Sequence, residues 1–230
     1  MIIYYNEKLE AKIRVFISST FRDMQTERNV IVNGIFPLLR REYKNRSVDI
    51  MEVDLRWGIT ESDISNMTLL EICIGETLNC VPFFVGLIGE HYGTLAKKEE
   101  IKMLPNAYKR AIGMRSRDDL PVGVSLTELE MRAGAFVKEN KHFSRFFLRD
   151  TEAERPEQLK RLKEKIISEG FEYHTYRDVA EFEALVGREL RKLIDEHIPR
   201  ELEAPYGDRH YVSHLKLLKR GSESYVPNDT

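Results

Sequence analysis

A short segment with the sequence SLTELE, at residues 125–130, carries the strongest candidates for acid–base chemistry. Ser125 and Glu128 have the spacing of a capping box, in which both side chains satisfy N–H groups at a helix start. Capping therefore accounts for Glu128. It does not account for Glu130, which lies beside the apolar face that Leu129 helps to form. A carboxylate in this position is the best candidate in the chain for a catalytic acid or base. The alternative is a partly exposed helix glutamate.

A second group of polar side chains follows the first apolar run of the chain. Thr20 and Asp23 have the spacing of a helix N-cap and its acidic partner, and capping alone would explain both. Free N–H groups at a helix start, next to Arg22, would also suit an anion. We therefore keep two alternatives, capping and contact with a phosphate or another ligand. The nucleotide-binding residues predicted here are Ser18, Ser19, Thr20 and Arg22.

Two further clusters follow the second and third apolar runs. Asp54, Arg56 and Trp57 combine an acid, a cation and the only tryptophan of the chain. They would hold a ribose hydroxyl and stack on a base, or an Asp–Arg pair would simply lock the loop. Glu90 and His91 come after the third run and are a weaker acid–base signal. We include Glu90 among the predicted nucleotide-binding residues.

Alternating strands and helices are expected to position these residues. Five apolar runs have strand length, and the third (FFVGLIG) has almost no polar residue, which is typical of a strand buried on both faces. The predicted strands are residues 13–18, 48–55, 83–89, 144–149 and 171–176. The stretches between and after them have helical periodicity. The predicted helices are residues 21–43, 69–80, 125–137, 156–169 and 179–197.

This alternation predicts a parallel five-stranded sheet with right-handed crossovers, in the strand order 2-1-3-4-5. The fold class is α/β, a three-layer flavodoxin-like or TIR-like fold. In such folds ligands bind beyond the carboxyl ends of the strands, where strands 1 and 3 diverge. The polar clusters follow the strands, so this rule places them at the same edge of the sheet.

Composition narrows the class of protein. The chain has 230 residues and a formal net charge of −2, which gives no reason to expect nucleic acid or an anionic membrane as a partner. No apolar run is long enough for a membrane helix. Cys73 and Cys80 lie seven residues apart on one predicted helix, too far to form a disulfide, and suit a reducing, cytoplasmic location. The histidines are scattered, so we predict no metal site.

Two stretches depart from the alternation. Residues 93–124 form a long charged insertion, which we expect to be either a lid or binding element, or a surface excursion. Residues 200–230 look like a linker with one short helix. The domain organisation expected from this pattern is one α/β domain at residues 1–199 and a linker at residues 200–230.

Four blocks of the sequence together resemble a known family. They are VFISSTFRDMQTERN, EVDLRWGIT, FFVGLIGEHYG and SLTELEMRAGAF. They are similar to the domain of unknown function 4062, over residues 12–198. That module begins STAND ATPases of the nephrocystin and telomerase-associated-protein types and related bacterial NTPases. The tail RHYVSHLKLLKRGSESYVP resembles the junction before the NACHT-like ATPase of such proteins. The resemblance thus implies a C-terminal NTPase domain as the partner within a longer protein.

The same module resembles TIR domains in layout, and many TIR domains cleave NAD at the bond between nicotinamide and ribose. Their catalytic glutamate opens the helix after strand 3, which Glu130 matches best and Glu128 second. The Trp-Cys pair of the TIR motif is missing here. The resemblance implies a homo-oligomer on activation, with NAD or a related nucleotide as substrate and no cofactor required.

Three functions remain open at this point. The first is an effector enzyme that hydrolyses NAD or a related nucleotide in antiviral or immune defence. The second is a non-catalytic module that signals by self-association or by recruiting a partner. The third is a nucleotide sensor or a deoxyribosyltransferase-like enzyme, which would use the same pocket.

Overall fold

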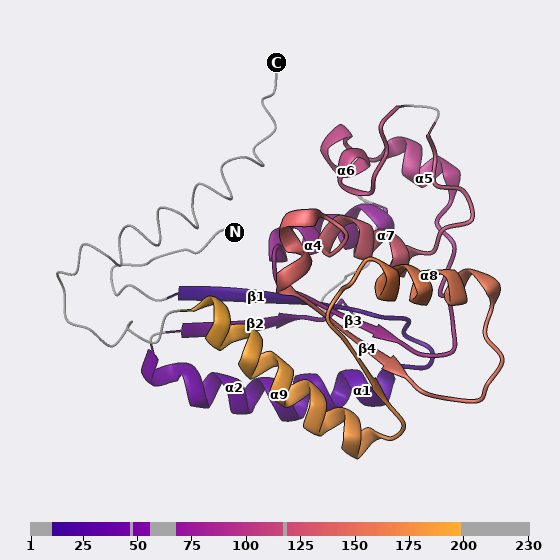
Figure 1. Ribbon diagram of the computed structural model, residues 1–230. Coiled ribbons are helices and arrows are strands. Elements are labelled where there is room, and N and C mark those ends of the chain that lie inside the picture. The colour runs from indigo at the N-terminus through magenta and orange to yellow at the C-terminus, as the bar shows by residue number, and fades with distance from the viewer. Residues whose placement is uncertain (1–10, 47, 56–67, 117–118, 199–230) are drawn as a thin grey trace.

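A computed structural model describes residues 11–46, 48–55, 68–116 and 119–198. Its centre is one sheet of five parallel strands in the order β2-β1-β3-β4-β5, which confirms the predicted order and the three-layer α/β fold (Figure 1). The predicted strand ranges agree with the structure to within two residues at each end. The strands are β1 (Ala11–Ser18), β2 (Val48–Val53), β3 (Phe84–Ile88), β4 (Ser144–Arg149) and β5 (Tyr173–Tyr176).

Helices cover both faces of the sheet, as Figure 1 shows. The first helical stretch and α9 (Val179–His197) cover one face, while α4 (Leu69–Cys80), α7 (Leu126–Gly134) and α8 (Glu157–Ser168) cover the other. Alternate strand residues point to opposite faces. In β1, Ile13, Val15 and Ile17 accordingly join the core under α9, whereas Phe16 joins the core under α8.

The helical stretch between β1 and β2 begins later than predicted and is not uniform. It consists of α1 (Gln25–Asn29), a π-helical segment η1 (Val30–Ile35) and α2 (Phe36–Tyr43), without a break. Pro37 lacks an N–H and therefore cannot make the usual hydrogen bond to the carbonyl four residues earlier. The wider turn just before it accommodates this loss, and Phe36 N donates to Ile31 O. Two short 3-10 helices complete the main frame, η2 (Lys44–Arg46) and η3 (Lys138–Phe143).

The described part of the insertion at residues 93–124 carries two short helices, α5 (Lys98–Met103) and α6 (Asn106–Ala111). Its two ends are joined by backbone hydrogen bonds, Ala96 N to Val124 O at 2.9 Å among them. Apolar side chains of the insertion form a third core with α4 and α7. These side chains include Ile101, Leu104, Ile112 and Met114 from the insertion and Leu70, Ile74 and Leu129 from the two helices. The described part of the insertion therefore packs on the outer side of these helices as a surface excursion with its own core.

Helix α7 lies unusually close to the sheet at Gly134. A Cβ atom there would be 2.5 Å from Cδ2 of Phe84 and 2.7 Å from Cγ2 of Thr77. The missing side chain therefore sets the distance between α7, α4 and β3. No helix in the described part of the chain is both long and apolar enough to cross a membrane.

Gly134→Ala is expected to lower the free energy of unfolding by about 1–3 kcal/mol, because the added methyl group overlaps a ring in the core. Gly34→Ala is the matched control. Its nearest neighbour would be Glu183 Oε1 at 4.0 Å, and alanine favours a helix, so stability should be unchanged or rise by up to about 1 kcal/mol. Urea unfolding of both variants measures the contrast. If both substitutions changed the free energy of unfolding equally, the close packing at Gly134 would be contradicted.

Candidate functional site

Glu130 of α7 meets the carboxyl end of β1. Ser18, the last residue of that strand, donates its hydroxyl to Glu130 Oε2 at 2.5 Å. Both residues are buried, with 0% of Ser18 and 7% of Glu130 exposed. The parallel strands direct their carboxyl ends to one edge of the sheet, and this brings together two residues that are 112 positions apart. The structure thus joins the predicted catalytic carboxylate to a predicted nucleotide-binding residue.

Burial changes the acidity of this carboxyl group. It raises the pKa of Glu130 from 4.5 to about 7, against the opposing effects of the Ser18 hydrogen bond, the Arg28 charge and a hydrogen bond with Cys73. Burial and the nearby carboxylate also raise the pKa of the Cys73 thiol, which is free. Glu130 therefore exchanges its proton near neutral pH, which suits a group that must act as a base or as a charge stabiliser.

A buried ion pair lies beside Glu130. Arg28 of α1 is 1% exposed, and its Nη1 donates to Asp54 Oδ1 at 2.5 Å. Its Nε donates to Ser19 Oγ at 2.6 Å and its Nη2 to Ser19 O at 3.1 Å, and Phe21 stacks on the guanidinium. Arg28 thus ties the ends of β1 and β2 to α1. Asp54 and Ser19 were predicted as site residues.

Sequence reasoning missed Arg28, although a signal was present. It lies four residues after Met24 and three before Ile31, so it shares the buried face of the helix with two core residues. A charged residue on an apolar helix face needs a buried partner of opposite charge. That requirement pointed to an acid at a neighbouring strand end.

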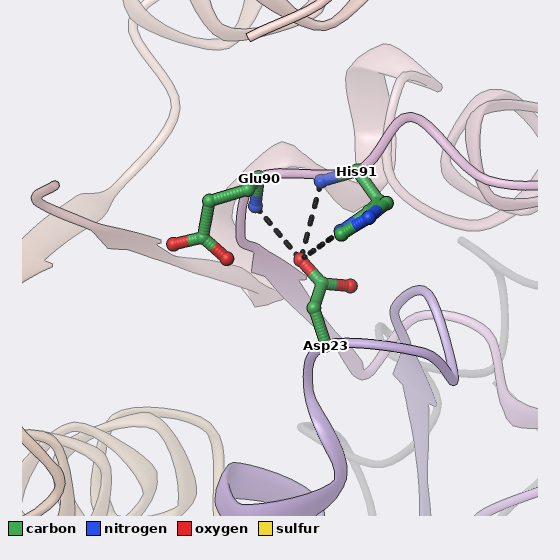
Figure 2. Close-up of side chains that lie close together, drawn as sticks. All are labelled: Asp23, Glu90 and His91. Carbon is green, nitrogen blue, oxygen red and sulfur yellow. Dashed lines mark hydrogen bonds and ion pairs between the residues drawn. The ribbon is translucent and has the colours of Figure 1, made fainter. Parts of the chain in front are cut away.

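Asp23 joins the loop after β1 to the loop after β3. Figure 2 shows its Oδ2 accepting hydrogen bonds from the backbone N–H groups of Glu90 at 2.7 Å and His91 at 3.2 Å, with His91 Nδ1 at 3.3 Å. Burial opposes ionisation of Asp23, but the hydrogen bonds from Thr20, Glu90 and His91 outweigh it and hold its pKa below the usual value. A Cβ at Gly89 would overlap the Asp23 carboxylate, so glycine is needed there.

Glu90 takes part in a separate charged group. In Figure 2 no dashed line joins its carboxylate to Asp23, and this carboxylate accepts a hydrogen bond from Arg149 Nη1 at 2.8 Å. Arg149 ends β4 and also binds the buried Glu27 of α1 at 2.5 Å, which accepts from Tyr176 at 3.0 Å as well. Arg149 and Glu27 were not predicted. They link the ends of β4 and β5 to α1.

The remaining predicted residues occupy different settings. Thr20 is buried and donates to Asp23, whereas Arg22 is exposed. Glu128 accepts hydrogen bonds from Tyr92 at 2.6 Å and from Arg132 at 2.6 Å, and its N–H is capped by Ser125. The predicted residues that lie outside the described part of the chain are Arg56 and Trp57. The predicted linker at residues 200–230 also lies outside it.

In the part of the chain that the structure describes, two groups of carboxylates and a histidine could in principle hold a metal ion, since the ligand atoms within each group lie within 4.8 Å of one another. They are Asp23, Glu90 and His91 in one group and Glu172, His174 and Glu189 in the other. In each group a cation already binds a carboxylate, since Arg149 contacts Glu90 at 2.8 Å and Lys192 contacts Glu172 at 3.3 Å. These cations would repel a metal ion, so neither group is assigned as a metal centre.

The chain is similar in sequence to a known family and to several larger proteins. A family model described as Domain of unknown function (DUF4062) matches residues 14–191. A TPR repeat-containing protein of Dictyostelium discoideum is 28% identical over 247 positions, which cover 96% of this chain and 14% of that protein. Telomerase protein component 1 of Mus musculus is 35% identical over 119 positions, covering 52% of this chain and 4% of that protein.

NACHT and WD repeat domain-containing protein 2 of Homo sapiens is 33% identical over 98 positions, which cover 39% of this chain and 6% of that protein. The chain therefore spans only 4% to 14% of the length of these three relatives. No solved structure matches the chain significantly.

Asp54→Ala is expected to lower the free energy of unfolding by about 3–5 kcal/mol, because it leaves the Arg28 charge buried without its carboxylate. Glu157→Ala is the matched control, since the Glu157–Arg161 pair is exposed and its loss should change stability by less than about 1 kcal/mol. Urea unfolding at neutral pH compares them. Similar small losses in both variants would show that the Arg28 pair does not hold the strand ends.

Glu130 should make the stability of the chain depend on pH. The folded chain keeps the Glu130 proton up to pH of about 7, whereas the unfolded chain releases it near 4.5. Stability from this group is therefore present below pH 4.5 and falls as pH rises to about 7, by about 3 kcal/mol. Glu130→Gln removes the titration, so the stability of the variant relative to the wild type should increase as the pH rises from 4.5 to about 7. Unfolding curves at both ends of the window test this, and a constant difference would contradict it.

Proposed function

Because the chain belongs to the DUF4062 family, we propose that it is an effector module of a larger STAND-type NTPase. Its partner within the parent protein is then a C-terminal NTPase domain, and it acts in the cytoplasm as a homo-oligomer once activated. The relatives support a place in a longer protein, because the chain covers so little of each. NACHT in the name of one relative supports the link to an NTPase.

The proposed activity is hydrolysis of NAD or a related nucleotide at the bond between the ribose and the base, in antiviral or immune defence. One observation carries it: Glu130 is a buried carboxyl group with a pKa of about 7, at the edge of the sheet where folds of this class bind ligands. A ribose hydroxyl would take the place of the Ser18 hydroxyl as donor to Glu130. No cofactor is needed for this reaction.

The reaction fits a single carboxylate. The bond between ribose C1′ and the nicotinamide nitrogen breaks, and its electron pair leaves with nicotinamide, which departs neutral. The ionised Glu130 stabilises the positive charge that develops on the ribose ring. It then accepts a proton from the water whose oxygen bonds to C1′. The products are ADP-ribose, nicotinamide and a proton.

Residues around Glu130 would keep this geometry in place. Ser18 and Ser19 end β1, and the Arg28–Asp54 pair holds β2 beside them. Glu128 is held by Tyr92 and Arg132 and faces a different set of partners, so we propose Glu130 and not Glu128 as the catalytic carboxylate.

A second candidate function is a non-catalytic module that signals by self-association or by recruiting a partner. The observation that favours it is that the polar side chains at the strand ends bind one another. Ser18 binds Glu130, Arg28 binds Asp54 and Ser19, and Thr20 binds Asp23. Such a network also serves simply to hold loops in place.

An enforced oligomer of the chain incubated with NAD separates the two functions. Glu130→Gln should lower turnover at least about 100-fold, since it removes the charge that stabilises the transition state. Glu128→Gln is the control on the same helix and should retain turnover. The rate of the wild type should rise with pH up to about 7 and then level, because ionised Glu130 is the active form.

Product analysis by mass spectrometry completes this experiment. ADP-ribose and nicotinamide in equal amounts identify hydrolysis. Full turnover in the Glu130→Gln variant would remove Glu130 from the mechanism. If the wild-type oligomer consumes no nucleotide and binds none by calorimetry, while the free chain self-associates with rising concentration, the second function holds instead.

A further inference from the structure

A separate pocket of about 340 Å³ lies where the chain passes from β4 to α8. In Figure 1 this is the long connection that follows β4 and turns back to α8. Three cations and two carboxylates give its lining a net charge of +1. The lining residues are Ala153, Glu154, Arg155, Lys160, Lys163, Glu164 and Ile167. None of them belongs to the group around Glu130.

Arg155 is fixed at the carboxyl ends of two adjacent strands. Its Nε donates to Gly89 O at 3.2 Å, directly after β3, and its Nη2 donates to Arg149 O at 2.6 Å, at the end of β4. Both acceptors are neutral backbone carbonyls. Within the described residues no carboxylate forms an ion pair with Arg155, so the guanidinium at the pocket wall is held in place without being neutralised.

Lys163 of α8 adds a second cation next to the first. It is half-buried and has no hydrogen bond or ion pair with a described residue. Burial and the Arg155 charge lower the pKa of Lys163, and the carboxylates of Asp150 and Glu90 offset this only in part. Those two carboxylates already pair with other cations, Asp150 with Arg177 at 3.3 Å and Glu90 with Arg149 at 2.8 Å.

The two lining glutamates do not neutralise this pair of cations. Neither Glu154 nor Glu164 forms an ion pair with Arg155 or Lys163 in the part of the chain that is described. Two neighbouring cations without a shared anion repel each other, and an oxyanion bound between them would remove that repulsion. A guanidinium and an ammonium at a strand end are also the groups that proteins use for phosphate.

We propose that this pocket binds the phosphate group of a phosphorylated small molecule. Arg155 supplies a fixed planar donor, Lys163 supplies a point charge, and Lys160 reaches the anion from the previous turn of α8. Ala153 and Ile167 form an apolar wall for the organic part of the ligand. The site lies at the carboxyl ends of β3 and β4. This is the ligand-binding edge of such sheets, although their usual ligand position is between β1 and β3.

Calorimetry with inorganic phosphate, AMP and adenosine tests the proposal on the full chain. Phosphate and AMP should each bind to one saturable site, and adenosine should not. Affinity should fall as salt rises, since the contacts are between charges. Binding should also take up protons at alkaline pH, because a bound anion raises the lowered pKa of Lys163.

Lys163→Gln should weaken phosphate and AMP binding by about tenfold or more, through the loss of one charge-assisted hydrogen bond. Lys165→Gln is the matched control, since Lys165 lies on the same helix outside the pocket, near Glu169. The unfolding midpoint of Lys163→Gln should be unchanged or raised, because the substitution removes a cation repelled by Arg155. A retained fold with lost binding therefore identifies the site.

Several outcomes would overturn the proposal. They are no saturable binding of phosphate or AMP, equal weakening by Lys163→Gln and Lys165→Gln, or adenosine binding as tightly as AMP. Phosphate binding alone, without a gain for AMP, would support a phosphate site and remove the apolar wall from it. Glu130→Gln should bind phosphate like the wild type, so the fate of this site is independent of NAD hydrolysis.

Discussion

The burial of one arginine organises the carboxyl edge of this sheet. Arg28 is 1% exposed, and a guanidinium without water must receive compensation from nearby acceptors. Asp54 supplies the opposite charge, and Ser19 supplies both a hydroxyl and a carbonyl. These acceptors come from the ends of two different strands. The hydrogen-bonding needs of Arg28 therefore keep the ends of β1 and β2 together beside α1. Ser18, which binds Glu130, directly precedes Ser19 and so lies next to these contacts.

Glu130 shows how the same burial serves both structure and chemistry. A carboxyl group in this setting loses hydration, so its neutral form is favoured and its pKa rises toward 7. That shift costs stability at neutral pH, and a residue with only a structural role would be replaced by a neutral one without loss. Under the proposed function, this cost accompanies a group that must change its charge during the reaction. The neighbouring Glu128 has two partners of its own and lacks this feature.

Charge is divided along the strand ends. Next to β1 and β2 the chain places a titrating carboxyl group and a neutralised ion pair, whereas the ends of β3 and β4 carry Arg149 and Arg155. Arg149 is neutralised by Glu27 and Glu90, but among the described residues Arg155 binds only backbone carbonyls. A nucleotide has both a ribose that interacts with a carboxylate and phosphates that interact with cations. The carboxyl group near β1 suits the proposed contact with a ribose, and the separate pocket at Arg155 suits the proposed phosphate.

The sequence alone determined the frame of this protein. Apolar periodicity predicted all five strands to within two residues, the helices at 69–80 and 179–197, and the strand order, because local patterns decide which face of an element is buried. Four sequence blocks also identified the family. The site was only partly predictable. Ser18, Asp54 and Glu130 were named, but their contacts with one another were not.

Tertiary structure decided the partners. Arg28, Glu27 and Arg149 acquire their roles only when the strand ends converge, since each binds residues from distant parts of the chain. The π-helical segment in the first helical stretch and the packing of the insertion on α4 and α7 were likewise decided by the surroundings. The apolar periodicity of the sequence predicts whether a side chain is buried. Which atom lies opposite it depends on the geometry of the whole sheet, and that information is not local.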